Sequence, residues 1–104
     1  MPKPFFSIVL PTKDRAFLLK PLIESILTQD FRDFEFIVVD NSDNDQIQDL
    51  LSQFDEITNH RTGGLNMADN WDKAISLAQG KFMILISDKI LFKKGALKYL
   101  HNFH

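Results

Sequence analysis

Short apolar runs alternate along this chain with longer segments whose apolar residues recur at helical spacing. Three runs, at 5–10, 34–39 and 82–86, are almost entirely apolar, which is typical of strands that are buried on both faces of a parallel sheet. A short, half-polar run at 56–60 predicts a weaker strand. The helical segments between the runs would provide the crossover connections that parallel strands need.

The first helical segment follows the strand at 5–10 and contains a proline. Because proline lacks an N–H and fixes φ, Pro21 predicts either that the regular helix begins near it or that the helix is kinked there. The apolar residues that would share one buried face are Leu18, Leu19, Leu22, Ile23, Ile26 and Leu27.

The second and last helical segments are short. Asp43 or Asn44 can cap the second, whose apolar residues within 47–54 make a narrow face. The segment 95–103 predicts a brief final helix. No sequence follows that would cover the far side of the strand at 82–86, so we expect a truncated unit, the front half of something larger.

The third helix is predicted to run from about Asn66 or Met67 to Gln79. Gly80 is expected to end it, because glycine commonly occupies the left-handed C′ position. The face predicted to be buried consists of Met67, Trp71, Ala74, Ile75 and Ala78.

Strands that alternate with helices predict an α/β fold. Right-handed crossovers would place helices on both faces, giving a three-layer α/β/α sandwich around a mostly parallel sheet of about four strands. A chain of 104 residues is expected to form a single domain over 1–104. Three apolar runs stop at polar clusters, which contain Thr12, Asp40 and Asp88. They would share one rim, where open α/β sheets bind ligands.

Composition excludes several classes of function. The content of 44% hydrophobic and 25% charged residues is that of an ordinary globular protein, and a net charge of −2 gives no electrostatic case for nucleic acid. The absence of cysteine excludes disulfides and thiolate metal sites. No signal peptide and no apolar stretch near the ~20 residues of a transmembrane segment is found. We expect a cytoplasmic location, free or peripheral at the inner face of the membrane.

Common nucleotide and hydrolase motifs are missing from the sequence, including G-x-G-x-x-G, the G-x-x-x-x-G-K-[ST] phosphate loop and G-x-S-x-G. A phosphoacceptor receiver domain needs an acidic pair after the first strand, and the segment 13–14 supplies one acid.

Five segments resemble family 2 glycosyltransferases. The segment 7–15, SIVLPTKDR, is similar to the family's SIVIPTYNR, and 34–42, FEFIVVDNS, is similar to FEIIVVDNS. The segment 25–31 resembles the helix end SILAQTF, and 65–71 with 78–82 resemble the LSMADNW and A-x-GEY of one subgroup. The resemblance covers nearly the whole chain. It implies the N-terminal nucleotide-sugar-binding half of a GT-A fold, which is Rossmann-like.

The resemblance implies transfer of a sugar from a nucleotide diphosphate donor, most often of the UDP type, to a hydroxyl acceptor. Pro11, Thr12, Asp40 and Asn41 would then hold the nucleoside, the Asp40 carboxylate accepting hydrogen bonds from a base N–H or a sugar hydroxyl. Arg61 falls where a basic residue could face the base or the diphosphate. Each also has a structural alternative: a turn at Pro11 and Thr12, a helix cap at Asp40, and a solvated guanidinium at Arg61.

The metal motif departs from the family pattern. Relatives carry D-x-D or DDD after the fourth strand and bind the sugar diphosphate through a divalent cation, whereas this chain has Ser87-Asp88-Lys89-Ile90. Asp88 alone would hold Mg or Mn weakly, since hard cations require several oxygen ligands. Either Lys89 neutralises the diphosphate as a point charge, or the site has decayed.

Two functions therefore stay open. The first is a glycosyltransferase-type domain that binds a nucleotide-sugar donor. The second is a catalytically inactive interaction module, which would form a homo-oligomer through an exposed sheet edge at 82–86. In inverting relatives the general base comes from the C-terminal half, so no catalytic residue is assigned and catalysis by these residues alone is not expected.

Overall fold

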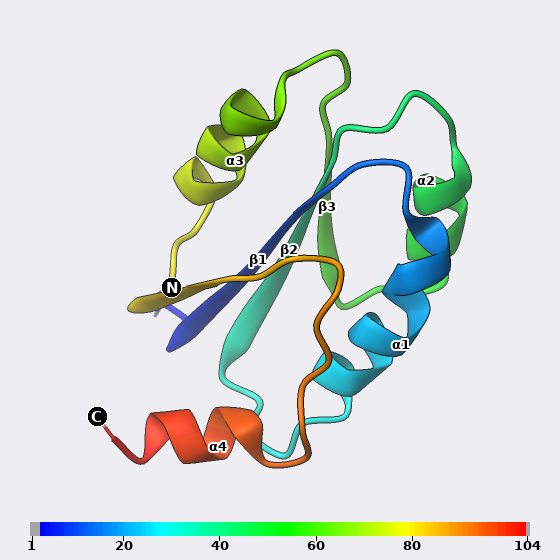
Figure 1. Ribbon diagram of the computed structural model, residues 1–104. Coiled ribbons are helices and arrows are strands. Elements are labelled where there is room, and N and C mark those ends of the chain that lie inside the picture. The colour runs from blue at the N-terminus through cyan, green and yellow to red at the C-terminus, as the bar shows by residue number, and fades with distance from the viewer. Residues whose placement is uncertain (1–2, 104) are drawn as a thin grey trace.

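The computed structural model describes residues 3–103 and arranges four strands and four helices in strict alternation (Figure 1). The strands are β1 (Phe6–Thr12), β2 (Phe34–Asp40), β3 (Ile57–Arg61) and β4 (Phe82–Leu85). They form one sheet in the order β3-β2-β1-β4, and every neighbouring pair is parallel. The predicted parallel sheet is confirmed, including the weak strand that became β3.

The helices lie on both faces of this sheet, which confirms the three-layer sandwich (Figure 1). They are α1 (Ala16–Leu27), α2 (Gln46–Leu51), α3 (Met67–Ser76) and α4 (Ala96–His101). The helices α1, α2 and α4 contribute to one core and α3 to the other. No helix within residues 3–103 has the length and apolarity needed to cross a membrane.

Alternation along β1 divides the core between the two faces. Phe6, Ile8 and Leu10 pack with α1 and α2 in the larger cluster, whereas Val9 packs with Ala74 of α3 in the smaller one. Since successive side chains of a strand point to opposite faces, an all-apolar strand can supply both cores. The predicted stripe of α1 is confirmed, with Leu19, Leu22, Ile23 and Ile26 buried.

Pro21 lies in the interior of α1. The expectation that the regular helix begins near Pro21 is therefore wrong, because Ala16 already has helical geometry. The N–H that proline lacks would have bonded the carbonyl of Phe17 four residues earlier. The four buried apolar side chains of α1 compensate for that lost hydrogen bond through packing.

The predicted buried face of α3 is confirmed at Ala74 and Ala78, which pack in the smaller core, and is wrong at Met67 and Ile75. Met67 is 75% exposed and Ile75 is 41% exposed, whereas the residues of α3 that are buried are Asn70 and Ala74. The apolar spacing suggested a helix facing the core along Met67 and Trp71. The helix is rotated so that the small Ala74 contacts the sheet, while Met67 and Trp71 line the cavity at the rim.

Gly80 does not end α3, which stops at Ser76. The glycine is needed for close approach instead: a Cβ at this position would lie 2.6 Å from Ser7 Oγ and 2.8 Å from the Ser7 backbone nitrogen. The Gly80 N–H donates to Ser7 Oγ over 2.7 Å. The residue therefore allows the chain to pass against β1 just before β4 begins.

Asn44, one of the two residues predicted to cap α2, lies one residue before the N-cap and satisfies a backbone donor of the first turn. Its Oδ1 accepts a hydrogen bond from the Gln46 N–H at 3.0 Å. The residue directly before the helix is Asp45, whose side chain makes no cap. The short last helix is confirmed as α4, with Leu97 buried.

Candidate functional site

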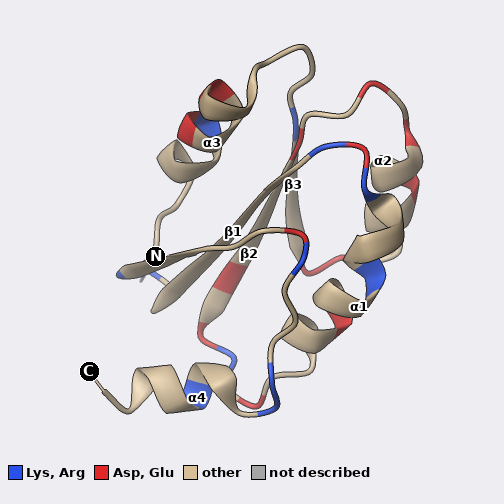
Figure 2. Ribbon diagram, in the orientation of Figure 1, with Lys and Arg blue, Asp and Glu red and all other residues tan. Residues whose placement is uncertain are grey.

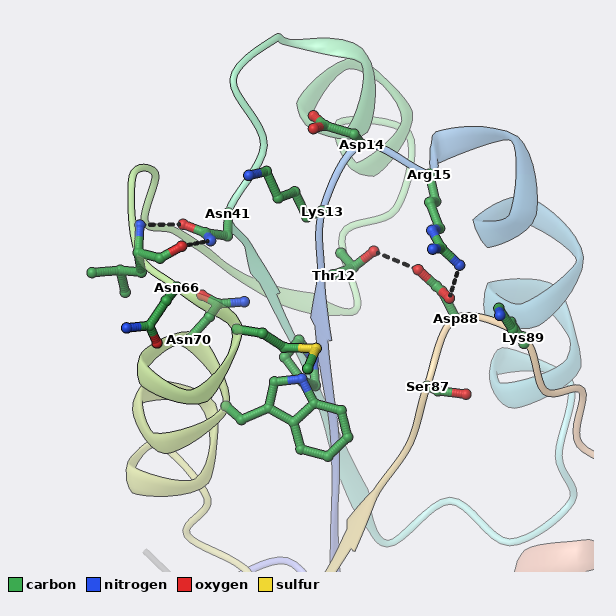
Figure 3. A pocket seen from close by; sticks show the side chains of 14 residues that line it. Thr12, Lys13, Asp14, Arg15, Asn41, Asn66, Asn70, Ser87, Asp88 and Lys89 are labelled. Atoms are coloured by element: carbon green, nitrogen blue, oxygen red, sulfur yellow. Dashed lines mark hydrogen bonds and ion pairs between the residues drawn. The ribbon is translucent and has the colours of Figure 1, made fainter.

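The strand order places a switch point beside β1. The crossover through α1 leads from β1 to β2, whereas α3 leads to β4 on the other side of β1 and over the opposite face. Connections that diverge in this way leave a crevice outside the carboxyl ends of the strands. A cavity of about 650 Å³ opens there, lined by residues from 11–15, 41, 65–67, 70–71 and 87–89 (Figure 3).

The polar clusters at the strand ends do meet at one rim, as predicted. Thr12 is the register partner of Asp40 on β2, and its Oγ1 donates to Asp88 Oδ2 over 3.3 Å. Thr12 is 4% exposed, so β1 and the segment after β4 are connected inside the cavity wall. The prediction that Thr12, Asp40 and Asp88 share one rim of the sheet is confirmed.

Asp88 is paired with a cation as well as with Thr12. Its Oδ1 lies 3.7 Å from Arg15 Nη1, and Figure 3 shows the two side chains pointing toward each other. The Asp88 side chain is 13% exposed and that of Arg15 is 46% exposed. Both carboxylate oxygens of Asp88 therefore have a partner within the chain.

Basic side chains outnumber acidic ones around the cavity. Lys13, Arg15 and Lys89 line it together with Asp14 and Asp88. Figure 2 shows these charges gathered where β1 and β4 end. The local balance is positive although the whole chain carries −2. Such a balance attracts an anionic ligand.

Asn41 lies at the cavity wall, but its side chain is hydrogen-bonded to the loop that precedes α3. Its Nδ2 donates to the Leu65 carbonyl at 2.7 Å, and its Oδ1 accepts from the Gly63 N–H at 2.8 Å and the Leu65 N–H at 3.2 Å. Gly63 and Gly64 both have positive φ, which glycine adopts without strain. Asn41 therefore fixes the segment that leads into α3.

The α3 side of the cavity was missed by the sequence reasoning, which assigned Met67 and Trp71 to the core. Both line the cavity, together with the buried Asn70, whose Oδ1 accepts from Thr62 Oγ1 at 2.8 Å. Spacing alone could not distinguish a core stripe from a cavity wall, because both are apolar and periodic. Lys13 and Arg15 were likewise not selected, although they belong to the polar cluster after β1.

Asp40 does not line this cavity. Its side chain is fully buried, with Oδ1 accepting from the Ser42 N–H at 2.9 Å and Oδ2 accepting from Gln48 Nε2 at 2.8 Å. Gln48 comes from α2, which covers this end of β2. The carboxylate thus shapes the turn after β2, and its predicted contact with a nucleoside stays a prediction.

Arg61 also lies outside the cavity. Its Nη1 donates to Asp45 Oδ1 at 2.6 Å and its Nη2 donates to the Asn44 carbonyl at 2.8 Å. The hydrogen bond to Asp45 raises the pKa of Arg61 above its ordinary value, so the guanidinium remains charged. Of the residues predicted for the site, those that the structure brings together are Pro11, Thr12, Asn41, Asp88 and Lys89.

Comparisons with known sequences agree with the resemblance. The model of the family described as Glycosyl transferase family 2 matches residues 7–103. An uncharacterized glycosyltransferase from Methanocaldococcus jannaschii is 34% identical over 98% of this chain and 39% of its own length. A GalNAc(5)-diNAcBac-PP-undecaprenol beta-1,3-glucosyltransferase from Campylobacter jejuni is 33% identical over 96% of this chain and 34% of its own. This chain therefore spans well under half the length of these relatives.

Solved structures show the same fold. Residues 1–349 of Staphylococcus aureus TarS give a TM-score of 0.80 over 95% of this chain and 32% of that chain, at 24% identity. A mannosyltransferase from Pyrobaculum calidifontis, in complex with GDP-Man and Mn²⁺, gives 0.74 over 93% and 31%, at 18% identity. These likenesses confirm the GT-A type of fold that the resemblance implied.

Proposed function

This chain belongs to glycosyl transferase family 2, and we propose that its cavity binds the nucleoside diphosphate part of a nucleotide-sugar donor. The observation that carries the proposal is the convergence of 11–15, 65–71 and 87–89 on one cavity at the switch point of the sheet. Its volume of about 650 Å³ lies in the range of small-molecule sites.

Within this cavity the diphosphate would lie on the side of Lys89 and Asp88, where the positive charges gather. The nucleoside would lie toward Pro11, Thr12 and Asn41, where backbone groups at the end of β1 can meet a base. A UDP-type donor is the working assignment. The Pyrobaculum mannosyltransferase holds GDP-Man, so the fold also accommodates guanosine.

The complete reaction would move the sugar to a hydroxyl acceptor. The Campylobacter relative is named as a glucosyltransferase, and this chain matches 34% of its length. The acceptor, the sugar and the general base are therefore not assigned to residues of this chain. A cytoplasmic location, free or at the inner face of the membrane, stays a prediction.

Titration with UDP, followed by backbone amide NMR shifts, tests the proposal. We expect saturable shifts at Thr12, Asn41 and Lys89, and none at Gln79 and Gly80 beyond the opposite end of the sheet. Uridine alone should shift the nucleoside side with lower affinity, because it lacks the diphosphate. Unchanged spectra at millimolar UDP would contradict the assignment.

A second candidate function rests on the open edge of β4. This strand has no neighbour beyond it in the sheet of residues 3–103, and Met83 on it is 42% exposed. Tyr99 and Phe103, in and just after α4, are 65% and 67% exposed. Unpaired edges with apolar side chains favour association. A dimer whose mass and stability are indifferent to UDP would favour an interaction module.

A further inference from the structure

The relatives' divalent cation does not fit the donor set of this cavity. Across residues 3–103, no group of three or more His, Cys, Asp or Glu side chains could hold a metal ion. The carboxylates that line the cavity are those of Asp14 and Asp88. Magnesium and manganese require several oxygen ligands, of which carboxylates supply the charge.

Each carboxylate already has partners within the chain. Asp14 Oδ1 accepts from the Asp43 N–H at 3.3 Å and from Asn44 Nδ2 at 3.5 Å. Figure 3 shows the Asp14 carboxylate turned away from Asp88. Asp88 is held by Arg15 and Thr12, so a metal would have to displace a guanidinium and then lie beside the ammonium of Lys89.

The same residues form a site for an anion. Lys13 and Lys89 have no ion pair or hydrogen bond with any described residue, so their ammonium groups can turn to a ligand. Arg15 uses one edge of its guanidinium on Asp88 and retains further N–H donors. The helices α1 and α3 also begin at this cavity, which adds the positive ends of two helix dipoles.

We infer that this cavity binds a nucleoside diphosphate without a divalent cation, with Arg15 and Lys89 neutralising the diphosphate. In this arrangement Asp88 is the anchor that holds Arg15 over the cavity, and it is not a metal ligand. The inference rests on the proposed function and specifies which groups neutralise the charge of the diphosphate.

Calorimetric titration of the chain with UDP, in excess EDTA and in millimolar manganese, is the direct test. We expect UDP to bind in EDTA at least as tightly as in manganese, since the cavity supplies the cationic groups and Mn²⁺ in solution already neutralises part of the diphosphate charge. Binding that appears with manganese and vanishes in EDTA would overturn the inference while supporting the proposed function. Absence of binding in both buffers would overturn the proposed function, and the inference with it.

Variants at exposed positions separate the charge of the cavity from the charge of the whole chain. Lys89→Gln should weaken UDP binding in EDTA by about tenfold, the loss of one charge-assisted contact. Lys20→Gln is the matched control, because Lys20 is an exposed lysine of α1 outside the cavity. An equal effect of both variants, or none at Lys89, would overturn the inference.

Lys89→Asp reverses the charge beside Asp88 and supplies a second carboxylate. We expect this variant to lose UDP binding in EDTA, because a negative charge replaces a positive one beside the diphosphate. Its circular dichroism and melting temperature should match those of the parent chain, because Lys89 is exposed. A Lys89→Asp variant that binds UDP in EDTA as well as the parent would contradict the role given to the lysine.

Discussion

The rim of the sheet has two halves that look alike in sequence and differ in structure. At the ends of β2 and β3, Asp40 is bonded to Ser42 and Gln48, and Arg61 is bonded to Asp45. At the ends of β1 and β4, polar side chains surround a cavity of about 650 Å³. In the half at β2 and β3, which we call the closed half, the polar side chains bond to one another. In the half at β1 and β4, which we call the open half, hydrogen-bond donors remain available to a ligand.

Helix placement explains the difference. The helix α2 follows β2 directly and brings Gln48 within 2.8 Å of the Asp40 carboxylate. No helix covers the ends of β1 and β4 in the same way, because α1 and α3 leave toward opposite faces there. The comparison teaches that a polar residue after a strand indicates a rim, while the next helix decides whether that residue faces a ligand or the fold.

Removing the Asp40 carboxylate should break the closed half of the rim. Asp40→Ala leaves the buried Ser42 N–H and the Gln48 amide without their acceptor, and such losses cost about 3 kcal/mol. Urea unfolding should therefore show a lower free energy of unfolding for Asp40→Ala, at an unchanged m-value. Asp43→Ala, an exposed neighbour in the same turn, is the control. If both variants are equally stable, the network around Asp40 is not structural.

Asn41→Asp tests the residue that joins the two halves. Aspartate has no Nδ2 donor for the Leu65 carbonyl, and it would place a negative oxygen against that carbonyl. We expect about 2 kcal/mol of destabilisation and loosening of the loop before α3. Hydrogen exchange at Gly63 and Leu65, whose N–H groups bond Oδ1, reports the loop directly. Unchanged exchange rates at both amides would refute this role.

Asp88→Asn tests whether Asp88, in the open half of the rim, acts as a metal ligand. The amide oxygen keeps an acceptor for Thr12 Oγ1, and the half-exposed pair with Arg15 contributes no more than about 1 kcal/mol. The variant removes a negative charge beside the diphosphate but also loses the ion pair that holds Arg15 over the cavity, so UDP affinity in EDTA should change little. A metal-ligand role for Asp88 predicts the opposite, a marked loss of affinity with manganese present.

Much of this architecture follows from local patterns. Three of the four strands, β1, β2 and β4, were predictable because each is a nearly uninterrupted apolar run, and the rim followed from their parallel order. The rotation of α3 could not be predicted, because Met67 and Trp71 have the spacing of a core stripe. Only the packing of Ala74 against Val9 decides which face of the helix is buried. Gly80 was misassigned for a related reason: its close approach to Ser7 is a contact between segments far apart in sequence.

The residues of the candidate site at the strand ends could be predicted from the sequence, but the side chains that pair with them could not. Thr12 and Asp88 were placed together by topology alone. The pairing of Asp88 with Arg15 and of Asp40 with Gln48 depends on how helices α1 and α2 begin and pack, which no local pattern encodes. These pairings decide which carboxylate supports the fold and which one borders the ligand.

Arg61→Gln should have the smallest effect, and this distinguishes the two halves most directly. Arg61 is exposed and lies outside the cavity, so the variant should leave UDP affinity unchanged. Its pair with Asp45 is solvated, so the melting temperature should shift little, and less at high salt than at low salt. Arg15→Gln removes a comparable charge from the open half and should weaken UDP binding. If Arg61→Gln reduces UDP affinity as much as Arg15→Gln does, then β3 contributes to the donor site and the rim is one binding surface, not two different halves.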